Sequence, residues 1–245
     1  MCAALLICKN ITKKFGGLTA LKEVSFSVTE REILGLIGPN GAGKTTLFNV
    51  IAGVYRPDNG TVVFEDQDIT NLPPYKRCKL GIARTYQLVR VFDEMNTIDN
   101  VVIGSLFGGQ RRLSLDEAFR EAEELLDFLQ ISGKKYVLCK ELTIVDKKKV
   151  EIARALATKP KLLLLDEPSA GLNPAEQNIM IRTLSEIREK RGITIFWIEH
   201  VLRMMKICDR ILVLNFGALI TEGRLEEIAR DTRVIEAYLG KTKVV

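Results

Sequence analysis

Residues 38–45 of the 245-residue chain read Gly38-Pro39-Asn40-Gly41-Ala42-Gly43-Lys44-Thr45. An apolar run of strand length, Ile33 to Ile37, precedes this stretch, and a helix-length segment, Lys44 to Ala52, follows it. Glycines let a backbone wrap around a phosphate chain so that several N–H groups point inward, and a helix N-terminus adds partial positive charge. The order of strand, glycine-rich loop and helix therefore predicts a phosphate-binding loop.

The loop supplies side chains as well as backbone donors. Lys44 can reach the β- and γ-phosphates of a nucleotide, and the hydroxyl of Thr45 can ligate Mg²⁺. The residues predicted to contact the nucleotide are Gly38, Asn40, Gly41, Ala42, Gly43, Lys44, Thr45 and Thr46. The alternative is a glycine-rich turn that matches by accident, and the flanking strand and helix count against it.

A second motif follows the unbroken apolar run Leu162 to Leu165, which is typical of a central parallel strand buried on both faces. Asp166 and Glu167 come directly after it, and ligands of open α/β sheets bind at the carboxyl ends of the strands. Asp166 would hold Mg²⁺, directly or through water, and Glu167 would orient and polarise an attacking water. The alternative is a strand that leads into an acidic turn.

Two further polar residues are candidates for the same chemistry. His200, the one histidine of the chain, follows the apolar run Thr194 to Ile198. At the end of a core strand it can contact the γ-phosphate or the attacking water, although a lone histidine is usually a surface or packing residue. Gln87 would be an ordinary exposed glutamine in the absence of the other motifs.

The remaining apolar patterns define an α/β chain with a helix-rich middle. Further strands are predicted at Leu5–Cys8, Val24–Val28, Thr61–Phe64 and Ile211–Leu214. Further helices are predicted at Asp116–Ile131, at Asp146–Ala157 and from Asn173-Pro174 to Gly192. Ser114 and Glu117 stand at capping-box spacing ahead of the first of these helices. Strands that alternate with helices predict an α/β fold with a parallel core sheet.

Composition narrows the class of protein. The formal net charge of +5 is too small a basic excess to indicate nucleic-acid binding, so we expect no nucleic-acid partner. Five scattered cysteines without metal-binding spacing are interpreted as reduced cytosolic thiols. The start, Met1 to Ile7, fits a first strand better than an export signal. No apolar run approaches the ~20 residues that span a bilayer.

Taken together, the motifs resemble those of the ATP-binding-cassette (ABC) ATPases, and the resemblance covers essentially the whole chain. The shared order is phosphate loop, Gln87, helical insertion, Asp166-Glu167 and His200. The resemblance implies ATP and Mg²⁺ as ligands, Glu167 as the catalytic base and His200 as a γ-phosphate switch. Gln87 would touch Mg²⁺ and communicate with a membrane partner. Phe15 would stack on adenine, with a core phenylalanine as the competing interpretation.

The resemblance also implies how a single ABC ATPase domain, residues 1–245, is organised. Residues 1–87 and 159–245 would form a P-loop NTPase core with a parallel sheet and an N-terminal antiparallel β subdomain, and residues 88–158 an inserted helical subdomain. The helical subdomain and the Gln87 segment would receive a cytoplasmic helix of a membrane permease, with Val89, Val91 and Phe92 as exposed apolar contacts. The chain would then be cytoplasmic and peripheral on the inner face of the cell membrane.

Finer features are similar to those of the branched-chain amino-acid importers. They are Lys13-Lys14-Phe15-Gly16-Gly17, Ala170-Gly171-Leu172-Asn173-Pro174, Ile198-Glu199-His200 and Val234-Ile235-Glu236-Ala237-Tyr238-Leu239-Gly240. The implied function is an ATPase that energises import of branched-chain amino acids, and lipopolysaccharide export is an alternative because its ATPase is a close relative. Gly171, Leu172 and Asn173 occupy the place of the family's dimer-contacting loop. Because the chain stops soon after Gly240, we expect no regulatory domain of the sugar-importer kind.

One segment departs from the family pattern. Relatives carry a signature loop, Leu-Ser-Gly-Gly-Gln, where this chain has Leu142-Thr143-Ile144-Val145-Asp146, called here the signature segment. Ile144 and Val145 are β-branched and avoid the positive-φ and close-approach geometries that glycine allows. Asp146 adds negative charge, with Lys147, Lys148 and Lys149 as compensation. Gly108-Gly109-Gln110-Arg111-Arg112 resembles a displaced signature but lies too early, and we interpret it as a basic loop.

This departure bears on assembly. In the family, ATP lies between the phosphate loop of one subunit and the signature loop of the other, so the sequence favours a heterodimer with a second ATPase subunit. A homodimer that tolerates the substitutions is the alternative. Two other classes stay open: a soluble ATPase of translation or DNA repair, and an ATP-binding regulator without hydrolysis. The first usually needs a tandem cassette or a coiled-coil insertion, and Glu167 and His200 argue against the second.

Overall fold

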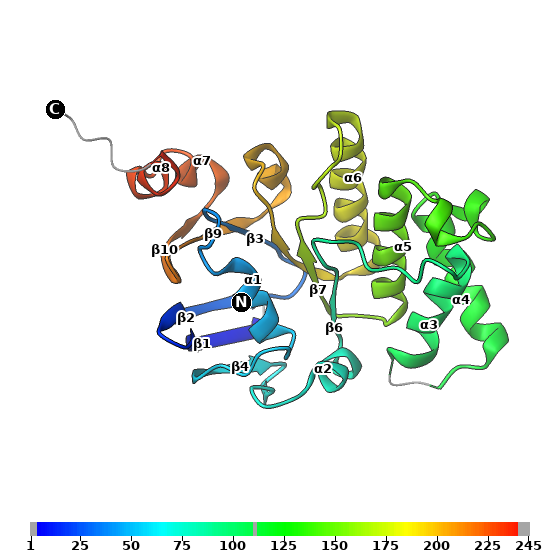
Figure 1. Ribbon diagram of the computed structural model, residues 1–245, viewed down its shortest axis with the longest axis horizontal. Helices are drawn as coiled ribbons and strands as arrows, with labels where there is room; N and C mark the ends of the chain where they lie inside the picture. The colour runs from blue at the N-terminus through cyan, green and yellow to red at the C-terminus, as the bar shows by residue number, and fades with distance from the viewer. Residues whose placement is uncertain (1–3, 110–111, 240–245) are drawn as a thin grey trace. The chain divides into compact units, whose positions relative to one another are not determined.

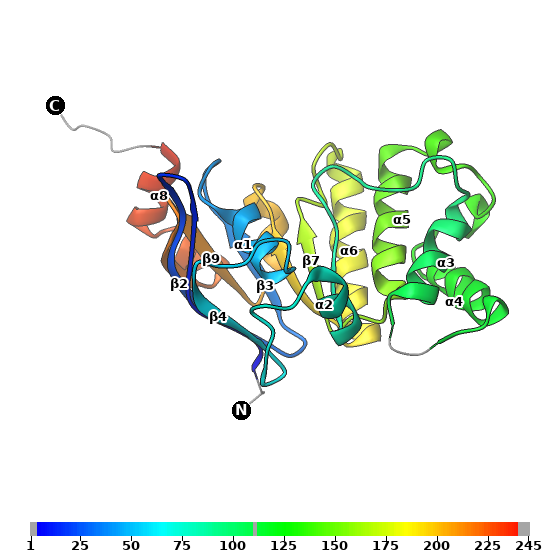
Figure 2. The same cartoon turned by 60° about the horizontal axis from the view of Figure 1, so that its bottom comes forward.

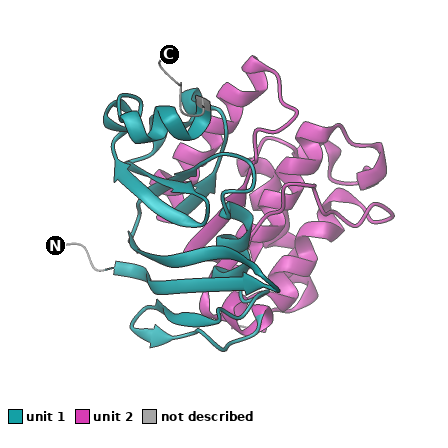
Figure 3. Cartoon of the chain, turned by 60° about the vertical axis from the view of Figure 1, so that its left-hand side comes forward, with its two compact units in different colours: residues 1–73, 194–245 teal, residues 74–193 magenta. Residues whose placement is uncertain are grey.

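The computed structural model describes residues 4–109 and 112–239. The chain divides into two compact units, residues 1–73 with 194–245 and residues 74–193 (Figure 3). The helix-rich stretch expected at 88–158 falls within the second unit, which also contains two strands and a long helix outside that stretch. Residues 110 and 111 of the predicted basic loop, and Gly240 of the C-terminal motif, lie outside the described residues.

The first unit begins with an antiparallel sheet in the order β2-β1-β4-β5 (Figure 1). Its strands are β1 (Ala4–Phe15), β2 (Leu18–Thr29), β4 (Asn59–Phe64) and β5 (Gln67–Asp68). Leu6 is paired with Val28 on one side and with Phe64 on the other, and all three are buried. The implied antiparallel β subdomain is confirmed. Its first two strands are longer than predicted, because their hairpin continues to the turn at Gly16 and Gly17.

Parallel strands form the core of the first unit. Strand β3 (Ile33–Ile37) pairs in parallel with β8 (Thr194–Ile198) and β9 (Arg210–Asn215), and β10 (Ala218–Gly223) runs antiparallel to β9. Every residue of β3 and of β8 is buried, as expected for strands covered on both faces. Helix α1 (Lys44–Ile51) packs on these strands through Phe48, whose ring centroid lies 4.9 Å from that of Phe196.

Short C-terminal elements complete the first unit. They are η3 (Leu202–Ile207), α7 (Leu225–Ile228) and α8 (Thr232–Leu239). Both α7 and α8 contact β10, and among their described side chains Ile228 of α7 and Val234 of α8 are buried. The motif at the C-terminal end of the chain is thereby attached to the strands that carry the phosphate loop.

The second unit combines the parallel strands β6 (Ile82–Arg84) and β7 (Leu162–Asp166) with helices. These are α2 (Pro74–Leu80), α3 (Thr97–Phe107), α4 (Leu115–Phe128), α5 (Ile144–Ala157) and α6 (Pro174–Arg191), with η1 (Ser132–Lys134) and η2 (Cys139–Glu141) as short 3₁₀ turns. Helices α3, α4 and α5 pack together (Figure 2). No helix within residues 4–109 and 112–239 is long and apolar enough to cross a bilayer.

Capping chemistry fixes the ends of α4. The predicted capping box is confirmed: Ser114 Oγ accepts the N–H of Glu117, and the Glu117 carboxylate accepts the N–H of Ser114. The helix ends at Phe128, before the predicted Ile131, because Gln130 takes a left-handed φ of 57°.

The other two predicted helices differ in how well their starts were placed. Helix α6 begins after Asn173, whose side chain accepts the N–H groups of Ala175 and Glu176, and it ends at Gly192 with φ 67°, as predicted. Helix α5 begins at Ile144 and not at Asp146, because Thr143 serves as its N-cap.

Candidate nucleotide site

The phosphate loop joins β3 to α1 in the first unit. Gly38 has φ 155° and Gly43 has φ 104°, conformations that residues with a Cβ rarely adopt. A Cβ on Gly38 would lie 2.1 Å from the carbonyl oxygen of Leu214, and one on Gly43 would lie 2.5 Å from that of Ala20. Both glycines are therefore required by the packing of the loop within its own unit.

Lys44 bends back onto the loop that precedes it. Its ammonium donates to the carbonyl oxygens of Gly38 at 2.7 Å and Pro39 at 3.1 Å, and the residue is 6% exposed. These two bonds hold the lysine that is predicted to reach the phosphates against the start of the loop. Among the other predicted contacts, Asn40, Gly41 and Thr45 are exposed, Gly43 and Thr46 are half-buried, and Ala42 is buried.

Phe15 stands at the end of β1, and 43% of it is exposed. Its ring packs edge-on against Tyr55 with centroids 5.3 Å apart, and Lys13 Nζ lies 5.5 Å from its centroid. The interpretation as a core phenylalanine is wrong, because the ring is too exposed. A half-exposed ring supported by a second aromatic is suited to stack on a planar base. Stacking on adenine stays a prediction.

His200 follows β8 and is exposed, and its backbone N–H donates to the carboxylate of the buried Glu199 at 2.9 Å. The histidine lines a pocket of about 290 Å³. The other lining residues, from η3 and the C-terminal helices, are Leu202, Ile228, Ala229, Val234, Ile235 and Tyr238. The first unit thus holds the phosphate loop, Phe15 and His200.

In the second unit, β7 carries Asp166 at its carboxyl end. Asp166 is 2% exposed, and its Oδ2 accepts from Nη2 of Arg84 at 3.0 Å. Arg84 ends the neighbouring strand β6, and its side chain is 6% exposed. The pair keeps a buried carboxylate next to a compensating charge. The sequence did not reveal this partner, because the three-residue strand β6 was not predicted.

Glu167 comes next and takes a left-handed φ of 50°, which is uncommon for a residue with a side chain. Its Oε2 accepts from Nε2 of Gln87 at 2.9 Å, and its carbonyl oxygen accepts from Nζ of Lys148 at 3.4 Å. Backbone conformations of this kind persist where surrounding contacts over-determine them, and they cluster at active sites. Glu167 and Gln87, both predicted to act in catalysis, are therefore in direct contact.

Helix α5 holds the segment around Gln87 through residues that the sequence did not single out. One oxygen of the buried Glu151 accepts the backbone N–H of Tyr86 at 3.3 Å and that of Arg90 at 3.2 Å, on either side of Gln87. Burial raises the pKa of Glu151. Arg154, one turn further along, donates to the carbonyl oxygen of Arg90. In the sequence, the only feature that points to Glu151 and Arg154 is their spacing of three positions, which places them on one side of a helix.

The signature segment forms a regular helix start. Thr143 Oγ1 accepts the N–H of Asp146 at 3.2 Å, and Ile144 and Val145 lie in the first turn of α5. Neither β-branched residue has a positive φ, so the expected conflict with backbone geometry does not occur. Ile144 is 49% exposed. The segment would therefore present the branched apolar side chains of Ile144 and Val145 to a partner.

The negative charge of Asp146 is balanced by a lysine that lies earlier in the chain than the three lysines expected to do so. Its Oδ2 accepts from Nζ of Lys134 at 2.6 Å and from the hydroxyl of Thr143 at 2.7 Å. Burial alone would raise the pKa of Asp146, but these two hydrogen bonds lower it. The compensating side chain in direct contact is thus Lys134. Of the three lysines expected to compensate, Lys149 also lowers the pKa of Asp146 through its charge, while Lys147 pairs with Asp93.

The predicted dimer-contacting loop lies between β7 and α6. Gly171 is exposed with φ 77°, and nothing lies within 4 Å of where its Cβ would be. Leu172 is 7% exposed, and Asn173 caps α6. The exposed glycine and the buried leucine suit a loop that is fixed at its base and open at its tip.

Comparison with known proteins defines the class. The family model described as ABC transporter matches residues 21–170, and one described as branched-chain amino acid ATP-binding cassette transporter matches residues 218–243. The chain therefore belongs to the ABC transporter family. It is the ATP-binding and ATP-hydrolysing subunit of an ABC transporter, and the predictions of family, fold class and enzymatic activity are confirmed.

Individual relatives are similar over nearly the full length. The high-affinity branched-chain amino acid transport ATP-binding protein LivG of Salmonella typhimurium is 38% identical over 98% of this chain and 100% of its own. The structure of the ADP conformation of MJ1267, an ATP-binding cassette of an ABC transporter, has a TM-score of 0.88 and 37% identity over 98% of this chain and 100% of its own. The dimeric post-hydrolysis state of the cassette MJ0796 has a TM-score of 0.82 and 26% identity over 90% of this chain and 98% of its own.

Proposed function

We propose that this subunit energises the import of branched-chain amino acids through a membrane permease that holds it on the inner face of the cell membrane. The full-length similarity to LivG supports this substrate class, and so does the match of residues 218–243 to the branched-chain family model. Among observations on the molecule itself, the contact between Gln87 and Glu167 carries the proposal. It connects the hydrolytic carboxylate to the segment that faces the permease in this family.

The proposed reaction is ATP + H₂O → ADP + phosphate. The phosphate loop binds the phosphates through its backbone N–H groups, and Lys44 neutralises the developing charge. Glu167 orients the attacking water and accepts its proton, and Gln87 holds the Glu167 carboxylate in place. His200 senses the γ-phosphate. Positioning and charge neutralisation supply most of the rate in phosphoryl transfer. Hydrolysis removes the γ-phosphate contacts that favour the closed dimer, so the two subunits then reopen.

Mg²⁺ fits the donors that this chain offers. No cluster of three or more acidic, histidine or cysteine ligands exists among residues 4–109 and 112–239. Mg²⁺ characteristically keeps several waters and is held by one or two carboxylates together with substrate phosphates. Thr45, Gln87 and Asp166 are the residues that would hold it. When bound, Mg²⁺ would offset the negative charge of the phosphates.

The exposure of the residues that follow Gln87 changes which of them we propose as contacts with the permease. Val89 and Val91 are half-buried, which corrects the expectation that they are exposed. Phe92 is 49% exposed and Leu88 is 82% exposed. Leu88, directly beside Gln87, therefore replaces the two valines as the main candidate contact with a cytoplasmic helix of the permease.

The subunit dimerises in the proposed cycle, and a different ATPase subunit is the favoured partner. The branched surface of Ile144 and Val145 is a poor match for the close approach to a nucleotide that glycines permit. In such a heterodimer this chain's phosphate loop faces a standard signature loop, and the partner's phosphate loop faces the signature segment.

Reconstitution tests the proposed function. The chain would be co-purified with the permease subunits of a branched-chain amino-acid importer and placed in lipid vesicles, and ATP-dependent uptake of labelled leucine would be measured against a lipid or sugar substrate. We expect leucine uptake that is lost with Glu167→Gln. Hydrolysis without amino-acid uptake, together with stimulation by lipopolysaccharide, would favour the export alternative. Full hydrolysis by the chain alone as a homodimer would remove the main support for a heterodimer.

A further inference from the structure

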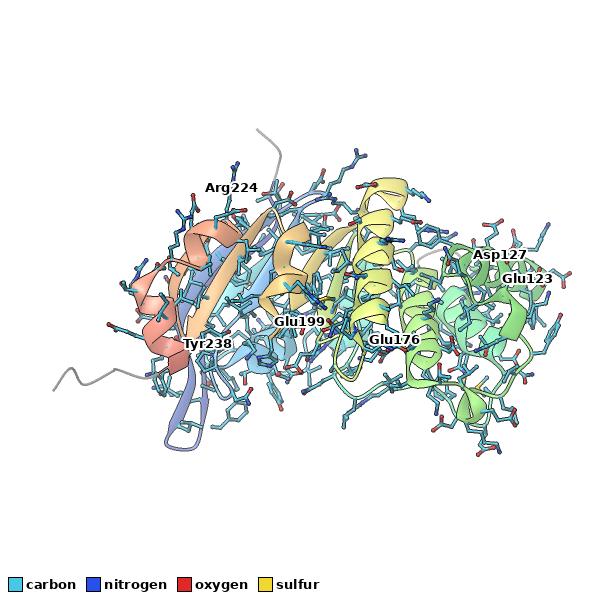
Figure 4. The ribbon with its side chains drawn as sticks, turned by 90° about the horizontal axis from the view of Figure 1, so that it is seen from above. Glu123, Asp127, Glu176, Glu199, Arg224 and Tyr238 are labelled. Carbon is cyan, nitrogen blue, oxygen red and sulfur yellow. The ribbon has the colours of Figure 1, made fainter. Side chains whose placement is uncertain are left out.

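One side chain of the C-terminal helix α8 contacts the start of the phosphate loop. The backbone N–H of Gly38 donates to the hydroxyl oxygen of Tyr238 at 2.9 Å, although the two residues are 200 positions apart in the sequence. Figure 4 shows Tyr238 on α8. Burial raises the pKa of the Tyr238 hydroxyl, so at neutral pH it is an uncharged acceptor.

Gly38 is held on three sides. Its N–H is bonded to Tyr238, its carbonyl oxygen accepts from Lys44 at 2.7 Å, and a Cβ on it would lie 2.1 Å from the backbone of Leu214. Gly38 is itself buried. A shift of this residue would therefore move the carbonyl that Lys44 uses, and with it the lysine predicted to reach the phosphates.

Packing alone fixes α8 only loosely. Among the described side chains of this helix Val234 is buried, while Ile235 is 44% exposed and Tyr238 is 42% exposed. The pocket of about 290 Å³ lies on the side of α8 that faces His200. Since little close packing surrounds the helix there, the hydroxyl of Tyr238 is a specific attachment between α8 and the loop.

We propose that Tyr238 is a positioning residue for the nucleotide: its hydroxyl fixes Gly38, and through Gly38 it sets the affinity of the phosphate loop for ATP and ADP. This inference rests on the proposed roles of the loop residues. Removal of the hydroxyl leaves a buried N–H without its acceptor, and such a donor is costly to keep in place. The loop then relaxes toward conformations whose donors no longer converge on a phosphate chain.

The test compares Tyr238→Phe with wild type and with Tyr75→Phe, a control that removes the hydroxyl of a 62% exposed tyrosine on α2. Affinities for Mg·ATP and Mg·ADP would be measured by calorimetry, with hydrogen exchange of the peptide that contains Gly38. We expect Tyr238→Phe to bind both nucleotides about three- to tenfold more weakly, the range for loss of one hydrogen bond. We also expect faster exchange at Gly38, with a fall in the unfolding midpoint smaller than that of a variant that removes packing from α8.

A second variant separates positioning from general support. Val234→Ala loosens α8 but keeps the hydroxyl, so it should lower stability more than Tyr238→Phe and nucleotide affinity less. Equal nucleotide affinity of Tyr238→Phe and wild type would overturn the proposal. The proposal would also be overturned if, in Tyr238→Phe and Val234→Ala, the loss of nucleotide affinity were simply proportional to the loss of stability. A wild-type chain that bound neither nucleotide would instead overturn the roles proposed for the loop, and this inference with them.

Discussion

The phosphate loop and the signature segment are both short turns that open a helix, but they constrain their sequences in different ways. In the phosphate loop, a Cβ on Gly43 would lie 2.5 Å from the carbonyl oxygen of Ala20, so packing within the unit demands glycine. In the signature segment, Thr143 caps α5 and Ile144 is 49% exposed, with ordinary helical geometry. Nothing within the described residues of the second unit demands glycine in the signature segment, so we expect any demand for glycine there to come from outside the chain, such as from a nucleotide bound to a partner.

Glu167→Gln tests whether both regions serve one reaction. Glutamine keeps the shape of the side chain and an oxygen that accepts from Gln87, but it cannot take a proton from water. We expect steady-state hydrolysis to fall about 10²–10⁴-fold with ATP affinity unchanged, measured by phosphate release and titration. ATP-dependent homodimers of this variant, detected by size, would show that the signature segment works between identical copies. Undiminished hydrolysis would exclude Glu167 as the base.

Gly43→Ala tests the internal demand on the phosphate loop. The added Cβ meets backbone at 2.5 Å with φ 104°, so we expect a loss of about 1–3 kcal/mol in unfolding free energy and about tenfold or more in ADP affinity. Urea denaturation and calorimetry measure the two effects. Gly171→Ala is the matched control, because Gly171 has φ 77° but open space at its Cβ position. An equal loss in both variants would mean that backbone strain, and not packing, demands the glycine.

Replacing Ile144 and Val145 together by glycine tests the external demand. Glycine weakens the first turn of α5, so the unfolding free energy should fall by about 1 kcal/mol. We nevertheless expect the chain alone to hydrolyse ATP faster and more cooperatively, because two close-approach glycines are restored. The double alanine variant removes the branched side chains without adding backbone freedom and serves as the control. If neither variant gained activity, the signature segment would not be what limits a homodimer.

Glu151→Gln gives the smallest expected effect and concerns α5, the helix that begins at the signature segment and holds the backbone on either side of Gln87. Burial raises the pKa of Glu151 above its ordinary 4.5, while Lys148 and Arg154 oppose the shift. The folded state therefore favours the protonated carboxyl, and this contribution to stability is lost as pH rises from 4.5 through the raised pKa. Glutamine does not titrate and keeps an acceptor for Tyr86 and Arg90. In urea titrations, the unfolding free energy of Glu151→Gln should rise relative to that of wild type between pH 4 and pH 7. A difference that does not change with pH would contradict a raised pKa of Glu151.

The sequence predicted strands wherever burial on both faces produced an unbroken apolar run, as at Ile33–Ile37 and Leu162–Leu165. It missed α3 and β6 for physical reasons. Helix α3 is apolar on more than one side, since Ile98, Val101 and Val102 are all buried, and it therefore shows no clear helical period. Strand β6 is only three residues long.

For the site, the predictable residues were those whose chemistry depends on neighbours in the sequence. The phosphate loop and Asp166-Glu167 are local motifs, so spacing was enough to propose them. Arg84, Glu151 and Tyr238 act through contacts with residues 82, 65 and 200 positions away. No local pattern reports such pairings. The register of β6 with β7 and the packing of α8 had to be known first.

The left-handed backbone conformation of Glu167 lowers the stability of the fold at a position proposed to serve hydrolysis. Glycine or asparagine is more at ease at a φ of 50° than glutamate, by an amount on the order of 1 kcal/mol. With Glu167 as the proposed base, we expect a library of variants screened for heat resistance alone to accumulate these residues at position 167 and to lose turnover as its melting temperature rises.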